Sequence, residues 1–174
     1  MKSTNLADPQ RPIVAAVAMA YCRPKMMKRI VHFLGQCEVQ AIHFYRPFLS
    51  DKSYETSSFY SDKEILETYQ LGLSQVRKTG NLDVTFHTHL RPFLEDFLSK
   101  KYERILVTEP DSVQAKKSEM NFQWDLLMFG PEKGYTDREL QMLKAMNLEM
   151  RSFSQSHFRL ESAVPFIFGC LSGN

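Results

Sequence analysis

Two segments in the C-terminal half of the chain have residue types and spacing suited to a binding site. In the first, the apolar run Leu126–Phe129 leads directly into Gly130-Pro131-Glu132-Lys133-Gly134. The glycines permit backbone angles and close approaches that a Cβ atom would block, and the proline stiffens the turn. Ligands of open α/β sheets bind at the carboxyl ends of strands, so this loop offers backbone amides and carbonyls to a nucleoside-like ligand. A tight strand-to-helix turn also needs glycine and proline, so the pattern alone leaves both interpretations open.

The second segment is Phe158–Ala163, which contains Arg159 and Glu161. Taken alone, this arginine and glutamate are better explained as an ordinary charge pair at the start of a helix. The two segments together are more informative, because a capped helix and a strand are predicted between them.

Together the segments resemble the paired signatures of the uracil-N3 ribosomal-RNA methyltransferases of the SPOUT superfamily. That family has an apolar strand entering Gly-Pro-Glu-Gly-Gly-Phe, then a helix and a strand leading into Leu-Arg-Thr-Glu-Thr-Ala. Lys133 replaces a glycine, Tyr135 a phenylalanine, Leu160 a threonine, and Ser162 is a conservative stand-in for threonine. The residues identical to the family's two motifs are Gly130, Pro131, Glu132, Gly134, Arg159, Glu161 and Ala163.

The resemblance implies that S-adenosylmethionine (SAM) binds, bent, among three loops and is held mostly by backbone groups. Here the loops correspond to Thr108–Pro110, Phe129–Gly134 and Ser154–Leu160. The cofactor-binding residues expected from the resemblance are Thr108, Glu109, Phe129, Gly130, Pro131, Glu132, Gly134, Ser154, Phe158, Leu160 and Ser162.

The resemblance also implies a deep trefoil knot at the C-terminal end of an α/β sheet, and a homodimer that pairs through the knot region. No residue pattern predicts a knot, because threaded chains are nearly absent from proteins. The last apolar segment, Ala163–Leu171, is apolar nearly all round, which predicts a helix buried on both sides, within the fold or against a partner. Pro165 fits that helix in its first turn.

The implied reaction is in-line displacement of a methyl group from a sulfonium by a ring nitrogen. Arg159 is the candidate donor to a uracil oxygen, where it would stabilise the developing anion. Glu161 would orient Arg159 or receive a proton. His157 lies beside Arg159, but the family has an aliphatic residue there, so a role as base has little support.

Several features depart from the family. Its usual N-terminal RNA-binding domain is not expected, because residues 1–174 read as one methyltransferase domain with a flexible start over residues 1–11. Phe33, Gln36–Val39 and Ser154–Ser156 also replace family residues. The sequence therefore leaves a second possibility open, a catalytically silent protein that keeps the fold and binds the cofactor, RNA or a partner.

The basic cluster Arg23, Lys25, Lys28 and Arg29 is the best candidate for RNA contacts, although charge runs are usually solvated helix faces. His87 and His89 lack a third ligand at suitable spacing, so no metal site is predicted.

The composition is that of an ordinary globular protein of 174 residues, with 43% hydrophobic and 24% charged residues. The formal charge of +2 requires any RNA contact to be local or shared with another chain. No apolar run is long enough for a membrane span, and the polar start lacks the apolar stretch of a signal peptide. Three widely spaced cysteines indicate reduced thiols. We therefore expect a cytoplasmic protein that does not enter a membrane. The resemblance implies that its partner is ribosomal RNA or a ribosomal particle, not DNA.

The elements that position these residues alternate along the chain, which favours an α/β fold with a mostly parallel sheet. Capping boxes are predicted at Ser61–Glu64 and Thr136–Glu139. Helices are expected from Pro24, from Ser61 to near Gly80, over Pro92–Lys100, after Thr136, and over Ala163–Leu171. Strands are expected at Ile13–Met19, Val39–Tyr45, Val84–His87, Arg104–Thr108, Asp125–Phe129 and Leu148–Phe153.

Overall fold

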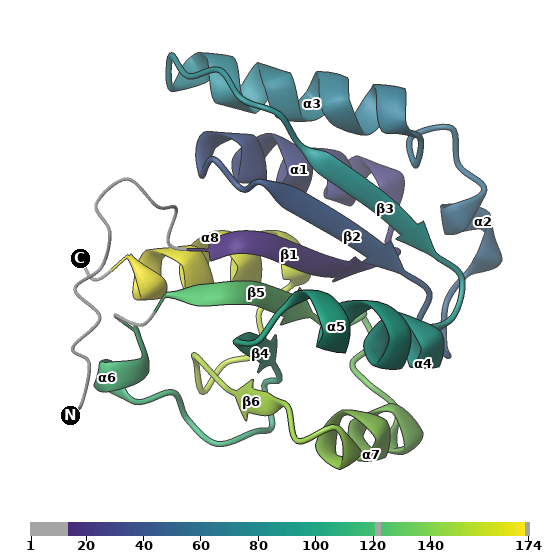
Figure 1. The fold of residues 1–174 in the computed structure, drawn as a ribbon, viewed down its shortest axis with the longest axis vertical. Helices are drawn as coiled ribbons and strands as arrows, with labels where there is room; N and C mark the ends of the chain where they lie inside the picture. Colours follow the sequence, from purple (N-terminus) through teal and green to yellow (C-terminus); the bar gives the residue numbers. More distant parts are fainter. Residues whose placement is uncertain (1–13, 121–122, 173–174) are drawn as a thin grey trace.

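A parallel six-stranded sheet forms the centre of the molecule (Figure 1). The structure, a computed structural model, describes residues 14–120 and 123–172, so Ile13 and the predicted flexible start lie outside the described residues. The sheet order is β3-β2-β1-β5-β4-β6, and all five pairings are parallel, which confirms the predicted fold class. The strands are β1 (Val14–Ala20), β2 (Ala41–Tyr45), β3 (Asp83–His87), β4 (Ile105–Thr108), β5 (Trp124–Phe129) and β6 (Glu149–Arg151).

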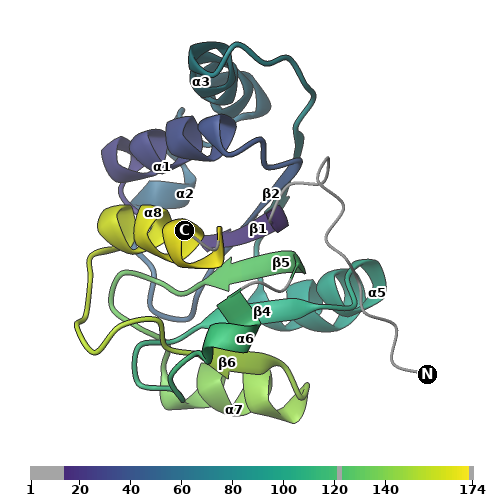
Figure 2. The same ribbon diagram turned by 90° about the vertical axis from the view of Figure 1, so that its left-hand side faces the viewer.

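Helices cover both faces of this sheet (Figures 1 and 2). One layer contains α1 (Pro24–Gln36), α3 (Asp62–Gln75) and α8 (Leu160–Leu171). The other contains α7 (Asp137–Ala145) and the successive helical segments α4 (Leu90–Pro92), η1 (Phe93–Leu98) and α5 (Ser99–Lys101), of which η1 is π-helical. Two short helices, α2 (Lys52–Glu55) and α6 (Lys117–Met120), were not predicted.

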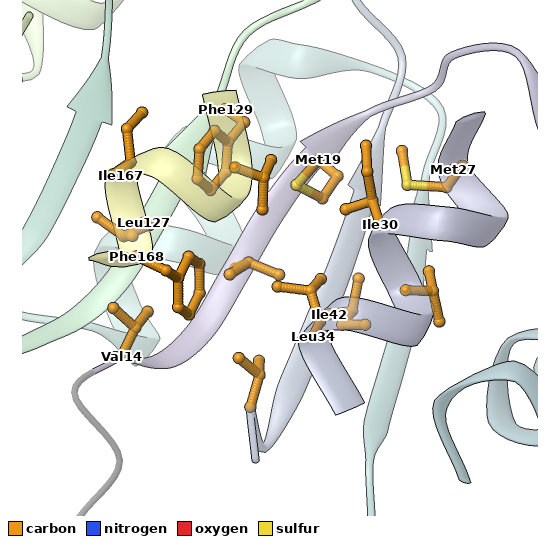
Figure 3. Close-up of a cluster of buried hydrophobic side chains, with 14 of the residues drawn as sticks. Val14, Met19, Met27, Ile30, Leu34, Ile42, Leu127, Phe129, Ile167 and Phe168 are labelled. Carbon is orange, nitrogen blue, oxygen red and sulfur yellow. The ribbon is translucent and has the colours of Figure 1, made fainter. Parts of the chain in front are cut away.

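The apolar run of β1 fills two cores because successive side chains of a strand point to opposite faces. Val17 and Met19 belong to the core with α1 and α8, and Figure 3 shows Met19 among side chains from both helices. Ala16 and Ala18 belong to the core on the side of η1 and α7. Burial on both faces explains why this strand reads as a continuous apolar run and not as an alternating one.

The ends of α3 differ from the prediction. Ser61 caps the helix by accepting from the Glu64 amide at 3.4 Å, but its own amide donates to Phe59 O, so the predicted reciprocal box is incomplete there. The complete box occurs at Thr136–Glu139. Helix α3 ends at Gln75 and not near Gly80, because Arg77 adopts a φ of 58° that does not continue a right-handed helix.

The last helix also corrects the prediction. It begins at Leu160, because the carbonyl of Arg159 already accepts from the amides of Ser162 and Ala163. Pro165 therefore lies in the second turn and not in the first, where it removes a backbone donor. One side of the helix packs into the core through Val164, Ile167, Phe168 and Leu171, whereas Phe166 is 41% exposed.

Candidate active site

The three loops expected to hold a cofactor meet in one cavity of about 750 Å³. They follow β4, β5 and β6, and because these strands are parallel neighbours their carboxyl ends lie at the same edge of the sheet. The first turn of α8 and one side of α7 complete the wall. The volume lies within the range of about 300–1,000 Å³ that is usual for small-molecule sites.

The loop after β5 is a tight turn fastened at both ends. Gly134 adopts a φ of 78° and its amide donates to Pro131 O at 2.9 Å. The ring of Tyr135 folds back onto Gly130, where a Cβ atom would lie 2.8 Å from Tyr135 Cε2. Both glycines are therefore required by the geometry of the turn.

A buried tyrosine from β2 holds this loop in place. The hydroxyl of Tyr45 donates to Phe129 O at 2.8 Å and lies 3.1 Å from the Tyr135 hydroxyl. Burial holds the pKa of the Tyr45 phenol well above its ordinary value, so it remains a neutral donor. The sequence analysis did not select Tyr45, although its position at the end of a predicted strand placed it at the ligand-binding edge.

The wall of the cavity after β4 carries a buried carboxylate. Glu109 is only 9% exposed, lines the cavity, and accepts from the Asp111 amide at 3.4 Å. Burial raises the pKa of Glu109, because a charged carboxylate is poorly solvated there. Nearby, His157 Nε2 lies 3.3 Å from Asp111 Oδ1, and both residues line the cavity.

Ten of the eleven residues expected to contact the cofactor line this cavity, and Ser162, on the exposed side of α8, does not. Gly134 leaves open space beside the backbone, and Glu109 has oxygen lone pairs that suit hydroxyl donors. The residues present therefore fit a nucleoside-containing cofactor. Those on the cavity wall are Thr108, Glu109, Phe129, Gly130, Pro131, Glu132, Gly134, Ser154, Phe158 and Leu160.

The two residues predicted to be catalytic are placed differently. Arg159 is exposed at the start of α8, between the cavity-lining residues Phe158 and Leu160, so it stands at the rim. Glu161 does not line the cavity, and its carboxylate lies 3.9 Å from the guanidinium of Arg29 on α1. In this chain Glu161 thus faces α1.

The predicted basic cluster is partly occupied by internal ion pairs. Arg23 Nη2 lies 3.4 Å from Glu132 Oε2, and the Arg23 amide donates to Glu132 Oε1 at 3.3 Å. Arg29 faces Glu161, as described above. Lys25 and Lys28 are exposed on the outer side of α1. Two of the four basic residues, Arg23 and Arg29, therefore connect α1 to the two signature segments.

Within residues 14–120 and 123–172, no group of three or more histidine, cysteine, aspartate or glutamate residues is arranged to hold a metal ion. Over the same ranges, no helix combines the length and apolar character needed to cross a membrane.

Comparison with known families identifies the class of protein to which this parallel sheet and its cavity belong. The family model for the RNA methyltransferase domain matches residues 9–172. The chain belongs to this RNA methyltransferase family, which confirms the expectation from the paired motifs.

A curated relative is ribosomal RNA small subunit methyltransferase E 1 of Borreliella burgdorferi, which is 24% identical over 148 residues. The match covers 85% of this chain but 62% of the relative, so the chain spans less than two thirds of that protein's length.

Solved structures show the same fold. A Legionella pneumophila protein in complex with SAM superposes with a TM-score of 0.76 at 16% identity, covering 92% of this chain and 66% of that one. Ribosomal RNA small subunit methyltransferase E of Neisseria gonorrhoeae bound to SAM gives 0.72 at 14% identity, covering 91% and 65%. The SpoU methyltransferase AviRb of Streptomyces viridochromogenes with AdoMet gives 0.56 at 11% identity, covering 94% and 62%. The fold is thus that of the SPOUT methyltransferases.

Proposed function

We propose that this protein transfers a methyl group from SAM to RNA, with N3 of a uridine in ribosomal RNA as the acceptor. The observation that carries the proposal is the cavity in which the three loops meet at the carboxyl edge of the sheet. The membership in the RNA methyltransferase family and the SAM held by proteins of the same fold support it.

The chain's own residues would first fix the cofactor. Backbone groups of the loop after β5 would hold the nucleoside, and the carboxylate of Glu109 would accept hydrogen bonds from hydroxyl groups. When bound, SAM supplies an electrophilic methyl group on a sulfonium. The enzyme's main task is then to align acceptor and methyl group and to stabilise charge that develops on the acceptor.

Arg159 would supply that stabilisation from the rim of the cavity. Its guanidinium is exposed and free to reach a base placed over the cavity, where it would donate to a uracil oxygen as the ring nitrogen loses its proton. Glu161 would act through the first turn of α8 and through Arg29, and a direct role in accepting the proton requires it to turn towards the cavity. Lys25 and Lys28 would contact RNA phosphates.

We further propose a cytoplasmic homodimer with the trefoil knot of its superfamily. The exposed Phe166 of α8 makes a ring contact with Phe158 at 5.1 Å between centroids. Both rings line the cavity, and their exposed parts provide an apolar patch at its edge for the second copy. The alternative is a catalytically silent protein that retains the cofactor cavity, and the departures from the family motifs favour it.

The deciding experiment is transfer of labelled methyl groups from SAM to small ribosomal subunits and to total RNA, followed by mapping of the modified nucleotide. Label at N3 of one uridine supports the full proposal. Label elsewhere corrects the acceptor, whereas SAM binding without transfer to any RNA favours the silent protein.

A further inference from the structure

The loop that follows β2 presents two large apolar side chains to solvent. Phe48 is 44% exposed and its neighbour Leu49 is 62% exposed. Both are close to the end of β2, at the edge of the sheet where the cofactor cavity lies.

This loop is held by specific contacts. The amide of Phe48 donates to Glu139 Oε1 at 2.8 Å, and Glu139 is a fully buried member of the capping box of α7. Arg46 adds a two-pronged interaction with Glu55, with Nη2 2.6 Å from Oε1. The exposure of the Phe48 ring is therefore fixed by the fold and is not a consequence of a loose loop.

An arginine lies against the exposed ring. The guanidinium carbon of Arg138 is 5.3 Å from the centroid of Phe48, a geometry that permits a cation–π interaction. Arg138 also lines a second hollow, of about 400 Å³, between the segment Leu90–Leu98 and α7. The floor of this hollow includes Leu94 and Met142, and its rim carries Arg91 and Gln141.

Helix α7 separates this hollow from the cofactor cavity. Asp137, Leu140 and Lys144 line the cavity, whereas Arg138 and Gln141, on another side of the same helix, line the hollow. The two sites are therefore about one helix diameter apart, roughly 10 Å, which adjacent or next-adjacent nucleotides of a single strand span easily.

We propose that Phe48, Arg138 and the adjoining hollow form a subsite for a nucleotide that flanks the methylated one in single-stranded RNA. The inference rests on RNA being the substrate, as proposed above. The flanking base would stack on the Phe48 ring, as bases stack on aromatic and arginine side chains in other RNA-binding proteins. Arg138 would contact the phosphate or a base acceptor, and Gln141 would offer both a donor and an acceptor.

The charge and the position of the site favour RNA over a protein partner. Among the charged residues on the wall of the hollow, Arg91 pairs with Glu95 at 2.9 Å, and Arg138 adds a positive charge beside the Phe48 ring, so the net charge suits a polyanion. The hollow adjoins the site at which RNA would be modified, whereas a protein partner would require a separate reason to dock there.

The probe is a fluorescein-labelled oligouridylate of twelve nucleotides, with 4-thiouridine at internal positions for photo-crosslinking. The wild-type chain should crosslink through peptides that contain Phe48 or Arg138. Phe48→Ala should weaken binding roughly five-fold or more, as expected when one stacked base is lost. Phe48→Trp should preserve binding, but Phe48→Leu, which keeps apolar area and removes the ring, should behave like the alanine variant. Arg138→Gln should also reduce the slope of log affinity against log salt.

Matched controls come from α3 and the turn that follows it, on the opposite side of the molecule (Figure 1). Leu71→Ala removes another exposed apolar side chain, and Arg77→Gln another exposed arginine; neither should alter binding. All variants should retain the melting temperature and the affinity for S-adenosylhomocysteine.

The subsite is rejected if the wild type gives no crosslink near these residues, or if Phe48→Leu binds as the wild type does. If the Phe48 variants lose binding to ribosomal subunits but still bind oligouridylate as the wild type does, Phe48 contacts a protein. That result would also overturn the subsite. If Phe48→Ala loses oligouridylate binding but the wild type methylates no RNA, the subsite stands while the proposed enzymatic function fails.

Discussion

Arg23, which follows β1, and Glu132, in the loop after β5, form an ion pair that connects the start of α1 to that loop. Their closest charged atoms are 3.4 Å apart, and the Arg23 amide also donates to the same carboxylate. An arginine suspected of binding RNA and a glutamate from the signature loop are thus partners across 109 residues of sequence.

This pair should matter more for ligand binding than for stability. Because Arg23 is exposed and its ion pair is screened by solvent, Arg23→Ala should leave the melting temperature almost unchanged. It should nevertheless weaken S-adenosylhomocysteine binding several-fold, because the loop loses an anchor. The exchange Arg23→Glu with Glu132→Arg should recover part of the affinity in calorimetric titrations. Affinities that are simply additive over this double-mutant cycle would show that the pair does not act as a unit.

Gly130→Val should abolish S-adenosylhomocysteine binding and leave a folded protein. The new Cβ would meet the Tyr135 ring at 2.8 Å, so the ring must move and the turn with it. The wild type should bind at micromolar strength and gain thermal stability with ligand. Gly169→Ala is the control, because its Cβ would meet no atom within 4 Å. Equal ligand-induced thermal shifts in all three proteins would contradict the assignment of the cavity.

Replacing Glu109 should raise the stability of the fold and weaken the binding of the cofactor product. The raised pKa of Glu109 means that the folded protein binds this proton more tightly than the unfolded chain does. Its contribution to stability is present below the unfolded-state pKa and is lost as pH rises through the folded-state pKa. Glu109→Gln should therefore raise the melting temperature at pH 7.5, and the gain should shrink at pH 4. The same variant should bind S-adenosylhomocysteine less tightly. A gain that is independent of pH would exclude ionisation as its cause.

Arg159→Ala should lower methyl transfer about 100-fold or more, by analogy with the loss of other oxyanion donors, and leave cofactor affinity nearly unchanged. Arg159→Lys should restore only part of the rate, because an ammonium lacks the planar fork of the guanidinium. The comparison uses labelled SAM and small ribosomal subunits under single-turnover conditions. Turnover equal to that of the wild type in Arg159→Ala would remove this residue from the mechanism.

The proposed homodimer predicts a particle of about twice the chain mass of 20.3 kDa in light scattering. A stable interface needs at least about 1,000 Å² of buried surface. Since Val164, Ile167, Phe168 and Leu171 already pack inside the chain, Phe166 is the residue of α8 that we expect at the interface. Phe166→Asp should dissociate the dimer, whereas Leu71→Asp, at an exposed site on α3, should not. A monomer at all working concentrations would refute the pairing.

The sequence by itself determined the fold class and placed the signature loops at the carboxyl ends of strands. Strands buried on both faces read as apolar runs, as in β1 and β5, and the turn at Gly130–Gly134 requires glycine whatever surrounds it. These features depend on residues close together in the chain, so local patterns carry them. Parallel pairing then brings the ends of β4, β5 and β6 to one edge, where the cavity lies.

Only the tertiary structure decided which side chains meet at that edge. The bond from Tyr45 to Phe129, the pairing of Glu161 with Arg29 and the stacking of Arg138 on Phe48 all join distant segments. They depend on β5 pairing beside β1 and on the angle at which α7 and α8 leave the sheet. The periodicity of apolar residues predicts which side of a helix or strand is buried. It does not predict which element packs against that side, because one apolar surface packs equally well against many other apolar surfaces. Partner choice is therefore settled by the packing of the whole chain.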